Sequence, residues 1–301
     1  MATKETLTEL KTLGELEHVK SGKVRETFRY TDRVLVFVAT DRISAFDIVL
    51  QDGVPDKGKV LTGISKFFFR ETKDICPSHF VSTRPQDFME LEDEVLKVLE
   101  GRTMLVEEMQ PIPFECIVRG HLCGSAWREY EKTGGVAGQD LPKGLTFGDK
   151  LKTPIFTPTT KAESGHDQPV TFQEMVAMIG ADDAEEVKRL SIELFDYGHR
   201  TAYNSGVVVI DTKFEFGYNR RGEICVMDEF MTPDSSRFWL KSDFKKDIKD
   251  QFYDKEYVRA YLSTLDWDKE PPAPHLPQEV IEEAQRRYRI VFEAITGQGL
   301  T

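Results

Sequence analysis

Residues 207–217 read VVVIDTKFEFG and residues 223–231 read EICVMDEFM, and the segment NRRG at 219–222 lies between them. Both stretches are rich in β-branched and aromatic residues, and the joining segment contains Asn and Gly, which favour a tight turn. The sequence therefore predicts an antiparallel β-hairpin at this place in the chain.

The first strand of this hairpin carries its charges on one face. Successive side chains alternate across a strand, so Asp211, Lys213 and Glu215 share one face. Phe214 and Phe216 share the opposite face and are expected to be buried. The strand thus predicts a charged surface backed by an apolar core.

The register of the hairpin decides which carboxylate of the second strand joins the charged face. With Tyr218 paired to Glu223, Lys213 faces Asp228, while Glu229 points to the other side. Two interpretations of this cluster remain open. It is either a solvated face with cross-strand ion pairs or a site at which carboxylates bridge Mg²⁺ to nucleotide phosphates.

Strands dominate the first part of the chain and helices the last part. Strands are expected at 16–20, 24–30, 34–39, 103–107 and 114–119, helices at 59–71, 124–132, 174–178, 184–204, 254–263 and 278–296, and a loop at 134–160. This segregation predicts an α+β fold rather than a doubly wound α/β sheet. Pro111 and Pro113 mark either a hinge between two lobes or a simple turn between strands.

The composition limits the classes of partner. The chain has 301 residues and a formal net charge of −12, from 40 basic and 52 acidic residues, which argues against a broad nucleic-acid-binding face. No apolar run approaches the roughly 18 residues that a membrane span needs. The four cysteines are scattered without a zinc-binding spacing, so reduced thiols in the cytoplasm are expected.

Two glycine-containing segments could approach a phosphate. Residues 53–59, GVPDKGK, match GxxxxGK, but Val60 follows where a P-loop needs a hydroxyl to hold Mg²⁺, so a turn before a helix is expected. The segment SGKVR places Gly22 in a turn, with Lys23 and Arg25 on one face of the next strand. A glycine turn lets backbone N–H groups reach a phosphate, although an ordinary hairpin has the same pattern.

Two further segments combine an arginine, a turn and hydroxyl groups. Arg119 precedes the turn GHLCG, and Ser125 stands at the start of an expected helix. Residues 232–236, TPDSS, form a turn that leads into Arg237. A helix N-terminus with a nearby arginine suits a phosphate monoester, whereas Ser125 alone is equally explained as a helix N-cap.

Six segments, taken in chain order, resemble one enzyme family. They read SGKVRETF (21–28), ATDRISAFD (39–47), ECIVRGHLCGSAW (115–127), IFTPTTKAE (155–163), DTKFEFG (211–217) and DEFMTPDSSRFW (228–239). On these segments the chain resembles the phosphoribosylaminoimidazole-succinocarboxamide synthase, or SAICAR synthetase, family in its longer, yeast-type form.

The resemblance implies a two-lobed α+β fold. Residues 1–110 would form an antiparallel, β-rich lobe whose kinase-like hairpin covers the phosphates of a nucleotide. Residues 111–301 would form a larger α+β lobe with the terminal helices and the metal, ATP and substrate sites. The two lobes would act as one integrated catalytic unit.

The resemblance also implies an ATP-dependent ligation in de novo purine biosynthesis. L-aspartate would be joined to the carboxylate of 5-amino-1-(5-phosphoribosyl)imidazole-4-carboxylate, giving the succinocarboxamide, ADP and phosphate. A carboxylate is a poor electrophile, so ATP must turn one of its oxygens into a leaving group, and the crowded negative charge calls for Mg²⁺, lysines and arginines. The alternatives are a kinase-like phosphotransferase on another small acceptor, whose HRD and DFG motifs the sequence lacks, and a non-catalytic nucleotide-binding module.

Residue roles are carried over from the resemblance position by position. ATP would be bound by Gly22, Lys23, Arg25, Glu107, Met109, Lys213 and Asp228. Mg²⁺ would be held by Glu215 and Asp228, which act in catalysis together with Lys213. The substrates would be bound by Asp41, Arg42, Ser44, Arg119, Ser125, Lys161, Asp234, Ser235, Ser236 and Arg237. The expected partners are therefore small molecules, without nucleic acid or membrane, and a monomer in the cytoplasm is expected.

Overall fold

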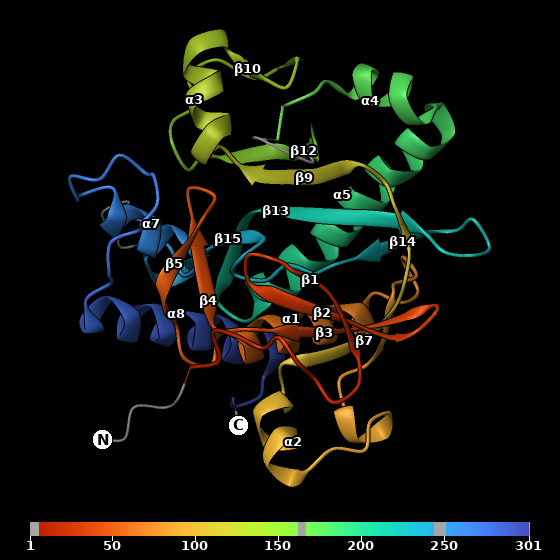
Figure 1. The fold of residues 1–301 in the computed structure, drawn as a ribbon. Helices are drawn as coiled ribbons and strands as arrows, with labels where there is room; N and C mark the ends of the chain where they lie inside the picture. Colours follow the sequence, from red (N-terminus) through yellow and green to blue (C-terminus); the bar gives the residue numbers. More distant parts are fainter. Residues whose placement is uncertain (1–5, 162–166, 244–250, 301) are drawn as a thin grey trace.

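Antiparallel sheets with helices packed on them make up the computed structural model, which describes residues 6–161, 167–243 and 251–300 (Figure 1). The expected α+β class is confirmed. The strands fall into two main sheets and two small hairpins.

The first sheet is built from the N-terminal part of the chain. Its order is β1-β2-β3-β7-β6, and every pairing is antiparallel. The strands are β1 (Glu17–Ser21), β2 (Arg25–Thr31), β3 (Val34–Ala39), β6 (Phe80–Ser82) and β7 (Thr103–Glu107). Phe28 and Val36 on one face join a cluster with Leu99 of helix α2 (Asp93–Leu99), while Phe37 on the other face packs toward the main core.

The second sheet surrounds the long strand β13 (Val207–Tyr218). Its main path runs β12-β9-β13-β14, and β15 and β8 also pair with β13. The other strands are β8 (Gln110–Pro111), β9 (Phe114–His121), β12 (Lys150–Thr160), β14 (Ile224–Met227) and β15 (Ser236–Leu240). Helix α5 (Ala181–Asn204) packs on β9 and β13, and α4 (Phe172–Ile179) packs on α5 and β12, so Phe214 and Phe216 are fully buried as expected.

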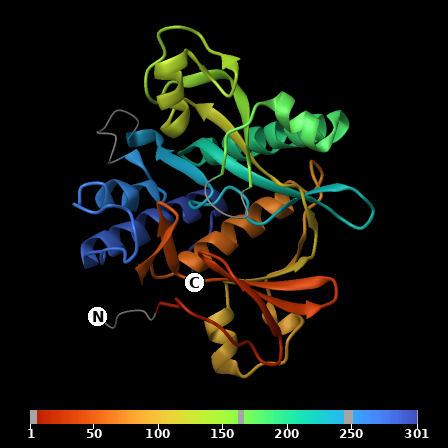
Figure 2. The same ribbon diagram turned by 45° about the horizontal axis from the view of Figure 1, so that its top comes forward.

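Helices α1 (Lys57–Glu71) and α8 (Gln278–Thr296) join the two sheets. Figure 2 shows α1 running between the N-terminal strands and β13. One continuous core contains Phe68 of α1, Met104 of β7, Phe214 of β13 and Tyr288 of α8. The sheets change between β7 and β8, but this core crosses the change, and the division into residues 1–110 and 111–301 stays a prediction.

The sequence did not predict the hairpin of β4 (Arg42–Ala45) and β5 (Ile48–Gly53). Its apolar side chains pack against α7 (Glu256–Leu262) and α8 rather than against the first sheet. The remaining elements are η1 (Pro85–Asp87), α3 (Gly124–Thr133), β10 (Gly135–Val136), β11 (Gln139–Asp140) and η2 (Lys241–Asp243).

The expected loop at 134–160 is wrong at its end, because β12 occupies residues 150–160. Its prolines suggested a loop, but β12 lies at the edge of its sheet, where proline is tolerated. The carbonyl of Pro158 accepts from Val170 N on the side away from β9, so the missing N–H of Pro158 costs no pairing with β9. In the motif at 155–163, residues 162 and 163 lie outside the described residues.

The predicted hairpin exists, but its register is shifted by one residue. Tyr218 pairs with Ile224, not with Glu223. The side chain of Asn219 accepts hydrogen bonds from the N–H groups of Arg221 (2.9 Å) and Glu223 (3.0 Å), and Asn219 N donates to Glu223 O (3.0 Å). This loop consumes one residue more than the expected turn, so Asp228 does not lie opposite Lys213.

The second strand ends at Met227, and Asp228 has a left-handed backbone conformation with φ 68°. If the strand continued in its observed register, Asp228 would face Phe214 on the apolar side of the sheet. The left-handed turn instead directs its side chain to Arg25 of β2. The charged cluster expected from the sequence is therefore reached by a backbone turn and not by strand pairing.

Gly58 is a position where the packing of α1 excludes a side chain. A Cβ there would lie 2.2 Å from the backbone oxygen of Ala39 and 2.7 Å from Nη1 of Arg102. Gly58→Ala should therefore lower the free energy of unfolding by about 1–3 kcal/mol in urea titrations. The control Gly299→Ala, with nothing within 4 Å, should change it by less than about 0.5 kcal/mol, and equal stability of the two variants would contradict this packing.

Candidate functional site

A polar cavity of about 380 Å³ lies where the second sheet meets the turn after β1, the β4–β5 hairpin and the start of α7. Nine residues expected from the sequence line it: Lys23, Ser44, Arg119, Ser125, Lys213, Asp234, Ser235, Ser236 and Arg237. They come from six separate parts of the chain, so the fold gathers most of the expected substrate-binding residues around one space.

Two arginines share one carboxylate at one end of this cavity. Asp211 Oδ2 accepts from Arg237 Nη1 (2.6 Å) and Arg119 Nη1 (3.4 Å). Arg119 also donates to Thr157 Oγ1 (2.9 Å) and to Ser125 Oγ (3.3 Å) at the start of α3. Strand pairing sets this arrangement, because Asp211 of β13 lies opposite both Arg119 of β9 and Arg237 of β15. We call these residues the arginine pocket.

The arginine pocket has the chemistry of an anion site. Arg119 is 7% exposed, and a buried guanidinium that shares one carboxylate with a second guanidinium has spare donors for an anion. Gly124 allows α3 to come close, since a Cβ there would lie 2.7 Å from Arg237 Nη2. The first N–H groups of α3 add their partial positive charge at the same end.

A second cluster, the lysine–carboxylate cluster, surrounds Lys213. Its ammonium contacts Glu115 Oε1 (2.7 Å) and Glu215 Oε1 (3.0 Å), and Lys161 forms an ion pair with the other oxygen of Glu215. Burial alone would lower the pKa of Lys213, but Glu215 and Glu115 outweigh it and raise that pKa above its ordinary value. Lys213 is therefore a fixed positive charge beside carboxylates.

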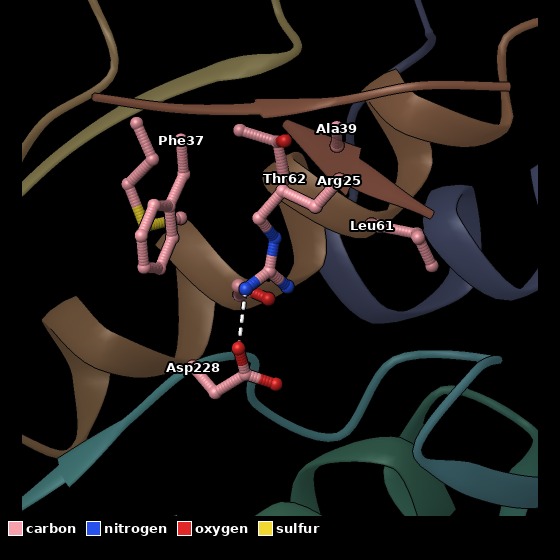
Figure 3. Close-up of a pocket in the computed structure, with 8 residues that line it drawn as sticks. Arg25, Phe37, Ala39, Leu61, Thr62 and Asp228 are labelled. Atoms are coloured by element: carbon pink, nitrogen blue, oxygen red, sulfur yellow. Dashed lines mark hydrogen bonds and ion pairs between the residues drawn. The ribbon is translucent and has the colours of Figure 1, made fainter. Parts of the chain in front are cut away.

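Asp228 joins this cluster from the opposite side. Figure 3 shows the guanidinium of Arg25 pointing at the Asp228 carboxylate in a cavity of about 10 Å³ between the first sheet and α1. Burial alone would raise the pKa of Asp228, but Arg25, Lys213 and Lys161 hold that pKa well below its ordinary value. Asp228 is thus ionised and lies within electrostatic reach of the lysines that contact Glu215.

The donor set fits magnesium bound together with phosphate. Glu215 and Asp228 offer carboxylate oxygens, and Mg²⁺ is commonly held by one or two carboxylates with the remaining positions filled by water and phosphate oxygens. Within residues 6–161, 167–243 and 251–300, no group of three or more metal-ligating side chains gathers. The site therefore suits a metal that arrives with a nucleotide better than a metal held by protein alone.

The turn between β1 and β2 lies over the other end of the cavity. Gly22 N donates to Arg25 O (2.7 Å), and Lys23 extends to Asp47 (2.5 Å) of the β4–β5 hairpin. Arg42 donates to the carbonyl oxygens of Gly22 (2.9 Å) and Lys23 (3.1 Å) and so stabilises the turn. The position of Lys23 agrees with a phosphate-covering hairpin.

Three expected substrate-binding residues, Asp41, Arg42 and Lys161, are not among those that line the cavity. Asp41 is fully buried and accepts from Arg102 (2.9 and 3.2 Å), Gly58 N (3.0 Å) and Leu7 N (2.9 Å). Arg42 clamps the glycine turn and binds Glu26 (2.6 Å). The charged groups of Asp41 and Arg42 thus bind other parts of the chain in this structure, and their substrate-binding role stays a prediction.

Glu107 and Met109 line neither of the two cavities described above. The N–H of Glu107 donates to His79 O (2.8 Å), and Glu107 itself is exposed at the end of β7. The residues expected to contact adenine therefore form the link between the two sheets.

Several residues of the cavity were missed from the sequence. They are Glu115, Asp211, Glu229, Lys255, Glu256 and Arg259. Glu115 could have been found from the sequence, because residues 115, 117 and 119 of β9 have period-two spacing and so share one face of the strand. The prediction that Glu229 points away is wrong, because it lines the cavity and accepts from Thr232 Oγ1 (2.5 Å). Lys255 and Glu256 approach only through tertiary packing.

All the comparisons with known proteins identify the same enzyme family. A family model described as SAICAR synthetase matches residues 18–274. A phosphoribosylaminoimidazole-succinocarboxamide synthase of Thermodesulfovibrio yellowstonii is 45% identical over 278 residues, 92% of this chain and 94% of that protein. The protein of the same name from Geotalea uraniireducens is 46% identical over 286 residues, 95% of this chain and 96% of the relative.

Solved structures give the same result. The SAICAR synthase of Saccharomyces cerevisiae, complexed with SAICAR, has a TM-score of 0.87 at 34% identity and covers 98% of this chain and 99% of its own. A SAICAR synthetase (Type-2) in complex with ADP has a TM-score of 0.70 at 22% identity over 95% of this chain and 99% of its own, a likeness of fold. The chain thus matches the yeast form closely, and its bacterial relatives have a similar length.

Asp254 gives the cavity a titratable group near neutral pH. Its carboxylate accepts from Phe238 N (2.7 Å) and Glu256 N (2.8 Å), while burial, followed by the charge of Glu256, raises its pKa to about 7. A raised pKa means that the folded state binds the proton more tightly, so this contribution to stability is present below the ordinary pKa of 3.8 and is lost as pH rises through about 7.

The free energy of unfolding should therefore fall between pH 5 and pH 8 more steeply in the unsubstituted protein than in Asp254→Asn. Urea titrations at several pH values measure this slope. The control Asp74→Asn, which changes an exposed carboxylate, should keep the original slope. Parallel pH profiles for Asp254→Asn and the unsubstituted protein would contradict the shift.

Proposed function

The chain belongs to the SAICAR synthetase family, and on that premise we propose how its residues carry out an ATP-dependent ligation that forms the succinocarboxamide. The substrates are L-aspartate and 5-amino-1-(5-phosphoribosyl)imidazole-4-carboxylate, and the other products are ADP and phosphate. The reaction belongs to de novo purine biosynthesis.

One observation supports this proposal more than any other. The arginine pocket and the lysine–carboxylate cluster lie side by side on β9 and β13, at the same cavity. A molecule with a phosphate at one end and a carboxylate at the other could bind the arginines with the first and meet the reacting phosphate of ATP with the second. The imidazole nucleotide of this reaction is such a molecule, since it carries a phosphate at one end and a carboxylate at the other.

In this proposal the arginine pocket binds the 5′-phosphate of the imidazole nucleotide. Arg119 and Arg237 donate in the forked geometry that suits phosphate, and Ser125 Oγ adds a donor at the start of α3. Ser235 and Ser236 complete the wall of the same pocket. Asp211 keeps both guanidinium groups oriented before the ligand arrives.

The lysine–carboxylate cluster acts on ATP. Lys213 and Lys23 would neutralise phosphate oxygens, with the turn at Gly22 beside Lys23, and Glu215 and Asp228 would hold Mg²⁺. When bound, Mg²⁺ supplies charge neutralisation at the transferring phosphate. In the structure Asp228 forms an ion pair with Arg25, which compensates its charge before the nucleotide binds.

The amine of aspartate attacks the activated carboxylate within the same space. Ser44 lines the cavity, and Lys161 pairs with Glu215, which also binds the cavity residue Lys213, so both are proposed to face substrate carboxylates. Holding the amine against the activated carbon converts a two-molecule step into one within a complex. Backbone groups near Glu107 and Met109 are proposed to hold adenine.

The setting of the enzyme is also a proposal. We propose a monomer in the cytoplasm that binds small molecules. The four cysteines are buried free thiols, and burial raises the pKa of Cys76 to about 12, which suits a reducing compartment. No helix within the described residues combines the length and apolar character of a membrane span.

ADP release should require both L-aspartate and the carboxylated imidazole nucleotide. A coupled assay with each substrate omitted in turn measures this, because the ligation stops without either acceptor or amine. ADP release that is indifferent to aspartate would favour the kinase-like phosphotransferase instead. ATP binding without any turnover would favour a binding module.

Asp228→Asn should reduce turnover of Mg²⁺-ATP by roughly three orders of magnitude, since a ligand to the metal that neutralises the transferring phosphate is lost. The coupled assay at saturating substrate reports the effect on kcat. Glu186→Gln, which changes an exposed carboxylate paired with Arg189 on α5, is the matched control and should keep full activity. Full activity of Asp228→Asn would remove this residue from the metal site.

A further inference from the structure

The most deeply buried ammonium outside the cavity belongs to Lys57, the first residue of α1. Lys57 is fully buried, and its Nζ lies 2.6 Å from Oδ2 of Asp234. The other oxygen of Asp234 accepts from the hydroxyl of Tyr288 in α8 at 2.9 Å. Three side chains far apart in the sequence thus form one buried group, which we call the Lys57 triad.

The start of α1 directs Lys57 inward. Asp56 has a left-handed φ of 64° and begins the helix, and Gln285 of α8 donates to its carboxylate (3.1 Å). Gly58 packs against Ala39 too closely for any side chain. The next lysine, Lys59, is only partly buried and lines a separate cavity between α1 and α8. In the segment GVPDKGK, therefore, Lys57 and not Lys59 reaches toward the cavity of the site.

The triad ends at the loop that carries part of the arginine pocket. Thr232 Oγ1 accepts from Asp234 N (3.2 Å), and Lys213 N donates to Ser235 O (2.9 Å). Ser236 Oγ shares a hydrogen bond with Thr212 Oγ1 (2.7 Å). Asp234 and the next three residues all line the cavity, whereas Lys57 does not, so Asp234 links Lys57 to the cavity wall.

The charge on Asp234 depends on its partners. Burial alone would raise the pKa of the Asp234 carboxyl, but Lys57 and Lys255 outweigh it and lower that pKa below its ordinary value. A buried ion pair that loses one partner leaves the other charge uncompensated, which is far costlier than an exposed loss. Without Lys57, Asp234 would have to turn toward water or take up a proton.

We propose that Lys57 and Tyr288 are positioning residues for the sugar-phosphate end of the site, acting through Asp234 on the loop that presents Ser235, Ser236 and Arg237. This inference rests on the proposed function. It assigns a role to residues of α1 and α8 that contact neither substrate nor nucleotide in the proposed arrangement. It also gives the GVPDKGK segment a purpose other than phosphate binding.

Substitutions in the Lys57 triad should weaken binding of the imidazole nucleotide and leave binding of ATP almost unchanged. Lys57→Met should raise the KM for the imidazole nucleotide about tenfold or more and leave the KM for ATP within about twofold, because a hydrogen bond to a charged group is lost on one side of the cavity only. Tyr288→Phe keeps the ring and removes only the hydroxyl, and should raise the same KM by about threefold. Lys59→Met is the matched control and should change neither KM.

A double-mutant cycle tests whether the effect passes through Asp234. In an Asp234→Asn background, Lys57→Met should have little further effect on the KM for the imidazole nucleotide, and thermal unfolding should show the same non-additivity.

Three results would overturn the proposal: an equal KM effect of Lys57→Met in both backgrounds, a fall in kcat with both KM values unchanged, or an unchanged KM in Tyr288→Phe. If Lys57→Met does not fold, the Tyr288→Phe result and the double variant, which removes both charges, decide the question. The unfolding cycle tests the triad without any activity. Absence of ligation by the unsubstituted protein would instead refute the proposed function.

Discussion

The pairing of β9 with β13 is the constraint on which the site depends. Asp211 lies opposite Arg119, and Lys213 lies opposite Ile117. Since direct partners in an antiparallel pair share a face, this register puts an anion pocket and a lysine–carboxylate cluster on the same side of the sheet. Their centres are two residues apart, or about 7 Å along the strand. The spacing suits substrates that carry anionic groups at both ends.

An acidic chain can bind anions because its charges are arranged locally. Around the cavity, the cations contact carboxylates, as Lys213 does with Glu115 and Glu215, and as Arg25 does with Asp228. Such pairs keep buried charges compensated in the absence of ligand. Because Lys213 and Arg25 each have a carboxylate partner, neither carries a bare charge before a ligand binds. The net charge of −12 therefore says little about this site.

Side chains from an early helix and from the last helix meet at the same site. Helix α1 follows the first strands, α8 closes the chain, and both reach Asp234 through Lys57 and Tyr288. The main core also contains side chains from both sheets. Motion of the N-terminal sheet relative to β13 would disturb this shared packing. The shared core therefore links the N-terminal sheet to the sheet that carries most of the cavity.

Local patterns in the sequence determined the strands β1, β2, β3, β7, β9, β13 and β14, most helices, and the common face of Lys213 and Glu215, because period-two alternation requires no knowledge of distant contacts. Motifs likewise identified nine of the residues that line the cavity, Arg119 among them. Only the tertiary structure decided the rest. Asp228 reaches the cluster through a left-handed turn after a shifted hairpin register. Asp41 forms a buried ion pair with Arg102. These outcomes depend on loop length and on partners distant in sequence, and no local period encodes such contacts.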